Sequence, residues 1–227
     1  MLSDQMETRV LVKTDRLTLE GIFGMPGDAE GTVLFAHGSG SSRFSPRNNF
    51  VAKRLCRHKL ATLLIDLLTP EEDRVYENRF DIALLTQRLA SVAQWINAES
   101  PARDLPLGLF GASTGAASAL QLAALLGKRI FAVVSRGGRP DLAEDALAHV
   151  TAPTLLIVGG EDDVVLELNR RALERLRAEK KLTIIPGATH LFEEPGALEA
   201  VADKAVEWFT RHLSPAKETR SAVRAKT

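Results

Sequence analysis

The sequence holds a serine in a setting that can make it a nucleophile. Ser113 is the centre of Gly-Ala-Ser-Thr-Gly at positions 111–115, directly after the apolar segment 105–110. This matches the Gly-x-Ser-x-Gly pattern, in which a serine stands on a sharp turn from a strand into a helix. Small residues flank such a serine because its backbone is strained and bulkier neighbours would collide with adjacent elements. The pentapeptide alone is equally compatible with an ordinary turn, so its partners decide the interpretation.

A base and an acidic group follow two later strands. A serine hydroxyl is a weak nucleophile at neutral pH and needs a base, which in turn needs a group that orients it. Asp162 follows an apolar strand expected at 154–158, and His190 follows one expected at 182–185. Parallel strands bring such loops to one edge of a sheet, and the chain order Ser, Asp, His suits a nucleophile on this kind of turn. We predict Ser113 as nucleophile, His190 as general base and Asp162 as the orienting acid.

The identity of the orienting acid is open, because a carboxylate residue stands on each side of Asp162. Asp162 ends the turn that begins at Gly159 and precedes Val165 by three positions, whereas Glu161 and Asp163 would project differently from that turn. A solvated acidic turn that caps the next helix is the alternative without catalysis.

Attack on an acyl carbon creates an oxyanion, which needs donors already in place. The backbone N–H of Thr114 supplies one because it directly follows the nucleophile. The glycine-rich loop 38–42, here called the oxyanion loop, should supply the other, with Ser39 as first choice and Gly40 as the fallback. His37 precedes this loop at a strand end, where a hydrogen-bonded structural histidine is expected rather than a catalytic base.

Arginines follow two of the strand ends. Arg43 and Arg47 come after the oxyanion loop, and Arg136 and Arg139 come after a strand expected at 130–135. Guanidinium binds carboxylate or phosphate in a bidentate manner, so we hypothesise that the substrate carries an anionic group near its acyl carbon. The predicted substrate-binding residues are Gly40, Arg43, Arg47 and Arg136. The alternative is a set of surface salt bridges to Glu71, Glu72 or Asp141. Asp66, at another strand end, is expected to anchor a loop, and the alternative is that it binds a polar group of the substrate.

The elements that position these residues alternate between strands and helices. Short apolar runs that end in Gly, Asp or Ser alternate with helical periodicity, which predicts an α/β fold with a mostly parallel sheet. The expected strands are 10–12, 17–23, 32–36, 61–65, 107–110, 130–135, 154–158 and 182–185, the first two as an antiparallel edge. The expected helices are 47–58, 78–98, 114–126, 141–148, 167–179 and 197–212. The connection 135–154 has room for one helix, which excludes a large lid.

Composition narrows the class of protein. The chain of 227 residues is expected to form a single domain over 1–213, followed by a polar, disordered tail over 214–227. Lys plus Arg (29) balance Asp plus Glu (29), which argues against a nucleic acid or an anionic membrane as partner. The lone Cys56 and the absence of an apolar run of about twenty residues favour a cytoplasmic protein. The scattered histidines have no metal-ligand spacing, so no metal is expected.

These residues resemble the α/β-hydrolase superfamily, and within it the small, lidless, dienelactone-hydrolase-like group. The resemblance runs from Thr32 to His212, and its most distinctive segments are 34–43, 111–115, 158–162 and 187–192. It implies an eight-stranded sheet flanked by helices and cofactor-free hydrolysis through Ser113, Asp162 and His190. The first segment is also similar to hydrolase domains that are joined to phosphoribosyltransferase domains, although this chain is too short to contain that partner.

One departure from the group changes the expected substrate. Dienelactone hydrolases use cysteine where this chain has Ser113, so a small carboxylic ester or thioester is expected rather than dienelactone. The function expected is a serine hydrolase that works through an acyl-enzyme, with a shallow pocket because no lid is present. The alternatives are an acyltransferase with the same triad and a ligand-binding module without catalysis. The sequence is compatible with a monomer or a homodimer.

Overall fold

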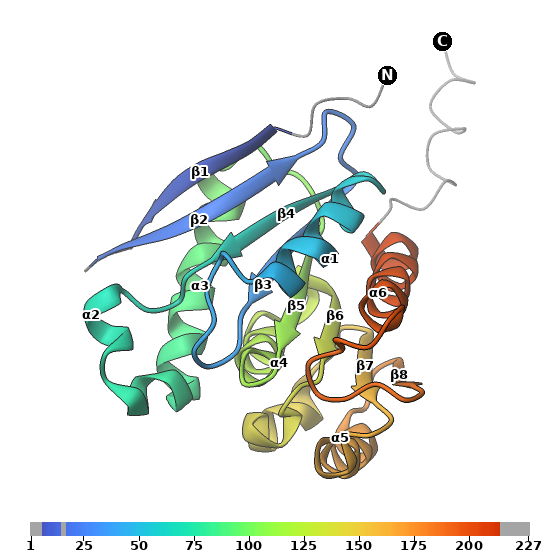
Figure 1. Cartoon of the computed structure of the whole chain (residues 1–227). Coiled ribbons are helices and arrows are strands. Elements are labelled where there is room, and N and C mark those ends of the chain that lie inside the picture. The colour runs from blue at the N-terminus through green and yellow to red at the C-terminus, as the bar shows by residue number, and fades with distance from the viewer. Residues whose placement is uncertain (1–5, 15–16, 214–227) are drawn as a thin grey trace.

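Eight strands form one sheet in the part of the chain that the computed structural model describes, residues 6–14 and 17–213 (Figure 1). Along the chain they are β1 (Met6–Lys13), β2 (Thr18–Met25), β3 (Gly31–Ala36), β4 (Leu60–Ile65), β5 (Leu107–Ala112), β6 (Ile130–Arg136), β7 (Thr154–Gly159) and β8 (Lys180–Ile185). Their order across the sheet is β1-β2-β4-β3-β5-β6-β7-β8. The pairs β1–β2 and β2–β4 are antiparallel, and all other neighbouring pairs are parallel. The carboxyl ends of β3 to β8 therefore meet at one edge.

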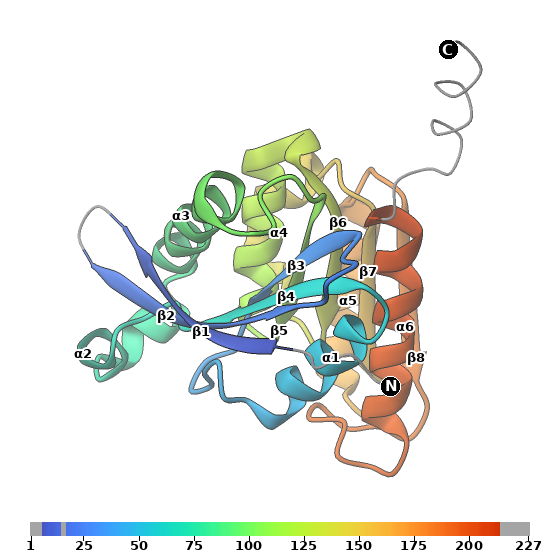
Figure 2. The same cartoon turned by 90° about the horizontal axis from the view of Figure 1, so that it is seen from above.

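Helices cover both faces of the sheet (Figure 2). The α-helices are α1 (Pro46–Cys56), α2 (Pro70–Asp73), α3 (Ile82–Glu99), α4 (Gly115–Leu126), α5 (Asp163–Arg175) and α6 (Ala197–Leu213), and the 3₁₀ segments are η1 (Tyr76–Phe80), η2 (Gly127–Arg129) and η3 (Pro140–His149). Helices α1 and α6 pack together on one face, while α3 and α4 pack side by side on the other. This arrangement buries apolar side chains on both sides of the central strands, as a mostly parallel sheet requires.

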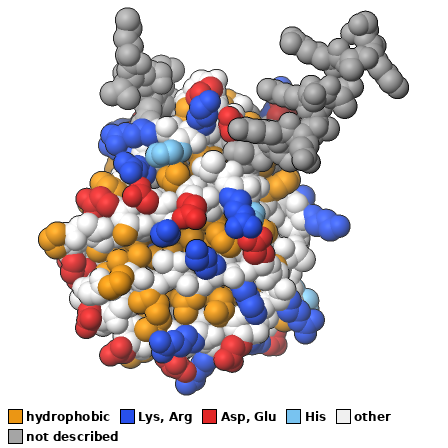
Figure 3. All heavy atoms as spheres, turned by 90° about the vertical axis from the view of Figure 1, so that its right-hand side faces the viewer, with side chains coloured by type: hydrophobic (Ala, Val, Ile, Leu, Met, Phe, Trp, Pro, Cys, Tyr) orange, Lys and Arg blue, Asp and Glu red, His pale blue; other side chains and the backbone are white. Residues whose placement is uncertain are grey.

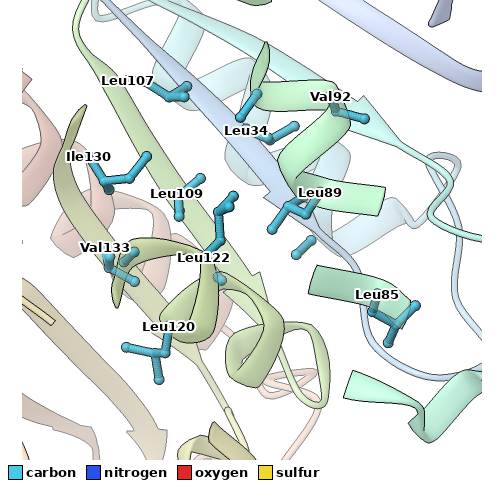
Figure 4. Close-up of a cluster of buried hydrophobic side chains, with 14 of the residues drawn as sticks. Leu34, Leu85, Leu89, Val92, Leu107, Leu109, Leu120, Leu122, Ile130 and Val133 are labelled. Atoms are coloured by element: carbon cyan, nitrogen blue, oxygen red, sulfur yellow. The ribbon is translucent and has the colours of Figure 1, made fainter. Parts of the chain in front are cut away.

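The largest core of buried apolar side chains lies between the sheet and the α3–α4 layer (Figure 4). Leu34 and Leu109 from the sheet, Leu89 from α3 and Leu120 from α4 are each fully buried in it. A second core, under α1 and α6, contains Phe35, Phe110 and Phe209. Because both cores are continuous under β3 and β5, the ends of these strands form a rigid base for the loops that follow them.

The fold predicted from the sequence is confirmed, with differences at helix ends. All eight expected strands are present, and the first two form the expected antiparallel edge. The helix expected at 78–98 begins only at Ile82, because Asp81 accepts a hydrogen bond from the Leu84 N–H and fixes the N-terminus there. Helix α5 runs over Asp163–Arg175 instead of 167–179, and the expected helix at 141–148 lies within the 3₁₀ segment η3.

The molecular surface shown in Figure 3 carries Lys and Arg side chains intermingled with Asp and Glu side chains. This face therefore presents no extended field of one sign. No helix within residues 6–14 and 17–213 is long and apolar enough to span a membrane. The tail predicted to be disordered, 214–227, lies outside the described residues.

Candidate active site

Ser113 stands on the sharp turn between β5 and α4, here called the elbow, with a left-handed backbone, φ 51°. Its N–H donates to the Arg136 carbonyl (3.2 Å), and its own carbonyl accepts from the Arg139 N–H (3.0 Å), so the end of β6 and the residues just after it hold the strained turn in place. The flanking glycines are sterically required. A Cβ on Gly111 would lie 2.4 Å from the Cα of Ala116, and a Cβ on Gly115 would lie 2.2 Å from the Ala36 carbonyl oxygen.

Asp162 and His190 form a hydrogen-bonded pair. The two residues follow β7 and β8, and His190 Nδ1 lies 2.6 Å from Asp162 Oδ2. An ionised carboxylate can only accept a hydrogen bond, so Nδ1 carries the proton. Nε2 then keeps a lone pair and can act as a general base. The side chain of Asp162 is 14% exposed and that of His190 is 38% exposed. Asp162 occupies the N-cap position of α5, yet its side chain makes no capping hydrogen bond. The Asp162 carboxylate therefore binds His190 and does not cap the helix.

Ser113 and His190 border the same short segment, residues 136–139 at the end of β6. Ser113 is hydrogen-bonded to the backbone of this segment at both its N–H and its carbonyl, while a Cβ built on Gly137 would lie 3.5 Å from His190 Cε1. Within the described residues, neither Ser113 Oγ nor His190 Nε2 has a hydrogen-bond partner, so the direct bond between them is not formed in this conformation. Such bonds are often long without substrate and tighten in the complex.

The two parts of the expected oxyanion hole contact each other. The Ser39 N–H, which was the first choice as second donor, donates to Thr114 Oγ1 at 2.9 Å. Its use as an oxyanion donor therefore requires the Thr114 hydroxyl to turn away. Gly38 abuts the nucleophile, because a Cβ there would lie 2.9 Å from Ser113 Cβ. The loop thus lies against the elbow, but the sequence did not indicate that a threonine hydroxyl occupies one of its donors.

His37 and Asp66 have structural partners. His37 Nδ1 lies 3.0 Å from the Gly38 carbonyl, and Nε2 accepts from the Leu67 N–H (3.3 Å), which agrees with the expected structural histidine. Asp66 accepts hydrogen bonds from the backbone and side chain of Arg43, so it anchors the oxyanion loop as expected.

Three of the four arginines considered for substrate binding are paired with carboxylates. Arg43 contacts Asp66 and Glu20; Arg47 contacts Glu193 at 3.0 Å; and Arg139 forms two hydrogen bonds to Asp141. The Arg139 pair is the salt bridge that the alternative interpretation named. Arg136 differs, because within the described residues it has no carboxylate partner, and it is only 7% exposed.

A shallow depression borders the oxyanion loop on the side of α2 and η1. Its lining combines Gly38, Ser39 and Gly40 of the loop with a second group, Leu68, Asp73, Arg79 and Leu85. The second group was missed from the sequence, although the capping box at Thr69 and Glu72 could have indicated the short helix that carries Asp73. No cluster of three His, Cys, Asp or Glu side chains suited to a metal occurs in the described ranges.

Comparison with known proteins identifies relatives over most of the chain. A curated relative from Mycobacterium tuberculosis strain H37Rv, named "Putative phosphoribosyl transferase Rv0571c", is 54% identical over 207 residues, which are 91% of this chain and 47% of the relative. The chain thus spans about half the length of that protein. The solved structure titled dienelactone hydrolase from Anabaena variabilis ATCC 29413 is also 54% identical, with a TM-score of 0.89, and the match covers 92% of this chain and 99% of that one.

More distant structures share the fold. Est1E from Butyrivibrio proteoclasticus superposes with a TM-score of 0.77 at 18% identity, over 90% of this chain and 98% of that one. The model of the "Dienelactone hydrolase family" matches residues 65–217, a range that contains the elbow, the acidic turn and the histidine loop. This chain is therefore a member of the dienelactone hydrolase family of α/β-hydrolases.

Proposed function

We propose that this protein is a serine hydrolase that cleaves a small carboxylic ester or thioester through an acyl-enzyme. Ser113 attacks the acyl carbon, His190 Nε2 takes the hydroxyl proton and returns it to the leaving group, and Asp162 holds the imidazole and stabilises its protonated form. Water then attacks the acyl-enzyme with the same base. The hydrogen bond between His190 and Asp162, beside a serine forced to positive φ, carries the proposal.

The oxyanion donors proposed are the Thr114 N–H and one N–H of the loop after β3. Ser39 becomes available once the Thr114 hydroxyl rotates, and Gly40 lines the depression beside the same loop. A short acyl or alcohol group is proposed rather than a long chain, because the described part of the fold has no large lid that would cover a long apolar chain. The family match supports a small-molecule substrate.

Labelling with a fluorophosphonate probe tests the proposal. The wild-type protein should be labelled at Ser113 and should hydrolyse short esters. Ser113→Ala should lose the label and reduce kcat by up to about 10⁶-fold, since the members of a triad act as a unit. Ser118→Ala is the matched control, because this buried serine lies one turn into α4 and bonds only to the Gly115 carbonyl. If the wild-type protein is neither labelled nor active on any ester, the proposal is wrong and a ligand-binding module without catalysis explains the protein better.

Acyl transfer uses the same intermediate and differs only in what captures the acyl group. Product analysis with an added alcohol or amine distinguishes the two reactions, because hydrolysis predicts free acid as the main product. Phosphoribosyl transfer is named for a relative about twice as long as this chain. We assign hydrolysis to this chain because the family match and the proposed triad both lie within it.

A further inference from the structure

Among the residues that the structure describes, Arg136 is a buried cation without a counter-ion. Its guanidinium donates a hydrogen bond from Nη2 to Asn48 Oδ1 at 3.3 Å, and its Nε is buried and has no partner in the described part of the chain. Phe192 lies beside it, with the guanidinium carbon 5.9 Å from the ring centroid. A buried charge is normally paired or fully hydrogen-bonded, because removing an ion from water carries a large free-energy penalty. Arg136 has neither arrangement among the described residues.

The surroundings of Arg136 add positive charge. Burial, and next the charge of Arg47, lower the pKa of Arg136 to about 10, so it stays protonated at neutral pH. Arg47 also has a buried Nε without a partner. Both Arg47 and Asn48 stand in the first turn of α1, an 11-residue helix whose N-terminus carries partial positive charge. Within the described ranges, the only carboxylate paired with this cluster is Glu193 on Arg47, and its side chain is 66% exposed.

We propose that Arg136, Arg47 and Asn48 form a binding site for a carboxylate or phosphate group. The unused N–H groups of the two guanidiniums can donate to oxygen atoms of such a group, and its negative charge would offset the two cations. The exposed Glu193 pair is weak, so an incoming anion can displace that carboxylate from Arg47 and reach the buried side chain behind it.

The site lies next to the proposed reaction centre. The Arg136 carbonyl accepts the Ser113 N–H, and Phe192 comes two residues after His190. An anion held here would therefore belong to the substrate, which makes the preferred substrate an ester that carries a second, charged group. This assignment to the substrate rests on the proposed hydrolytic function, whereas the existence of the anion site does not.

Equilibrium binding to the Ser113→Ala protein tests the site without any need for turnover. Succinate and inorganic phosphate are titrated separately by calorimetry, with chloride at equal ionic strength as the reference. We expect at least one of the two anions to bind. The anion that binds shows whether the site takes a carboxylate or a phosphate group. Arg136→Met should weaken this binding about 10- to 100-fold, the loss typical of charge-assisted hydrogen bonds. Arg54→Met is the matched control, since Arg54 pairs with exposed Asp203.

Folding is checked separately for each variant. Replacement of an unpaired buried charge by an apolar side chain is often neutral or stabilising, so Arg136→Met should keep the thermal midpoint while losing the anion. If that variant does not fold, Arg136→Lys, which keeps the charge but loses the planar fork, should still weaken binding. The proposal is overturned if neither anion binds the Ser113→Ala protein, or if the folded Arg136 variant binds as tightly as its parent.

The substrate assignment has its own measurement. Wild-type protein should show a higher kcat/KM for monomethyl succinate than for the uncharged methyl pentanoate, and Arg136→Met should remove this preference while Arg54→Met retains it. Equal kcat/KM values for the two esters would show that the anion site does not bind a charged group of the substrate. Failure to hydrolyse either ester would instead count against the proposed function. The existence of the anion site would then be decided by the calorimetric titration alone.

Discussion

The acidic turn after β7 offers three carboxylates, of which the structure connects one to the histidine. Asp162 Oδ2 lies 2.6 Å from His190 Nδ1, whereas Asp163 begins helix α5 and is exposed. We predict that Asp162→Asn lowers kcat by about 10⁴-fold, because an amide at that position favours the wrong histidine tautomer. The measurement is steady-state hydrolysis of a short ester by purified protein.

The neighbouring residue supplies the control for that experiment. Asp163→Asn should keep kcat near the wild-type value and reduce stability by about 0.3–1 kcal/mol, since a carboxylate in the first turn of a helix interacts favourably with its dipole. A large loss of kcat in Asp163→Asn together with an active Asp162→Asn would reverse the assignment of the orienting acid.

Thr114 contributes more than a backbone N–H to the site. Its hydroxyl accepts the Ser39 N–H at 2.9 Å and so ties the oxyanion loop to the elbow. A donor stabilises an oxyanion only while it is held in position, so loosening the loop should weaken catalysis. We predict that Thr114→Val lowers kcat by about tenfold, because this bond keeps the loop that carries the second oxyanion donor against the elbow until the hydroxyl rotates and frees the Ser39 N–H. Thr114→Ser, which retains the hydroxyl, should stay close to wild type. Unchanged kcat in the valine variant would show that this bond has no catalytic role.

At the scale of elements, the elbow depends on close contact between β5, α4 and the end of β3. A Cβ on Gly115 would meet the Ala36 carbonyl oxygen at 2.2 Å, and a backbone atom cannot move aside as a side chain can. We predict that Gly115→Ala destabilises the protein by about 1–3 kcal/mol or more and lowers ester turnover. Thermal unfolding should show this as a fall of roughly 2–4 °C for each kcal/mol.

Gly27 provides the matched comparison for this substitution. A Cβ there meets no atom within 4 Å, and its backbone lies outside the left-handed region. Gly27→Ala should therefore stay within about 0.5 kcal/mol of wild type. If Gly115→Ala were as stable and active as Gly27→Ala, steric closeness at the elbow could not be the reason for a glycine at that position.

The same elements show which parts of the structure can be read from sequence. Buried strands such as β5 and β7 are continuous apolar runs, and the reactive residues follow strand ends, so the strands along the chain and the places of Ser113, Asp162 and His190 after them could be predicted. Helix starts were less predictable. Asp162 occupies an N-cap position, but its side chain is used by His190, so the start of α5 lacks the usual capping hydrogen bond.

Side-chain partners from distant segments were beyond the reach of sequence patterns. Arg43 and Arg136 look alike as arginines that follow strand ends, yet Arg43 is neutralised by Asp66 and Glu20 while Arg136 faces Asn48 and Arg47. The difference depends on which residues of β2 and α1 the fold brings near each guanidinium. Local periodicity carries no information about such contacts, and only the three-dimensional arrangement distinguishes a neutralised arginine from a free one.

At the scale of the whole molecule, the described core ends at Leu213. This last residue of α6 is 1% exposed, and a Cβ on Gly31 or Gly108 would lie 2.7 Å or 3.1 Å from its side chain, so it closes the packing between α6 and the sheet. We propose that residues up to 213 form the folding unit. A variant that stops after Leu213 should keep the thermal midpoint and the ester turnover of the full chain.

The counterpart of this truncation is a substitution at the boundary itself. Leu213→Ala in the full chain should cost about 2–5 kcal/mol, because it removes buried methyl groups and leaves a cavity between α6, β3 and β5. Chemical denaturation of the three proteins separates the contributions, since a lower midpoint with an unchanged slope reports lost stability alone. If the truncated chain were destabilised as strongly as Leu213→Ala, residues beyond 213 would belong to the folding unit, and its boundary would have to be moved toward the C-terminus.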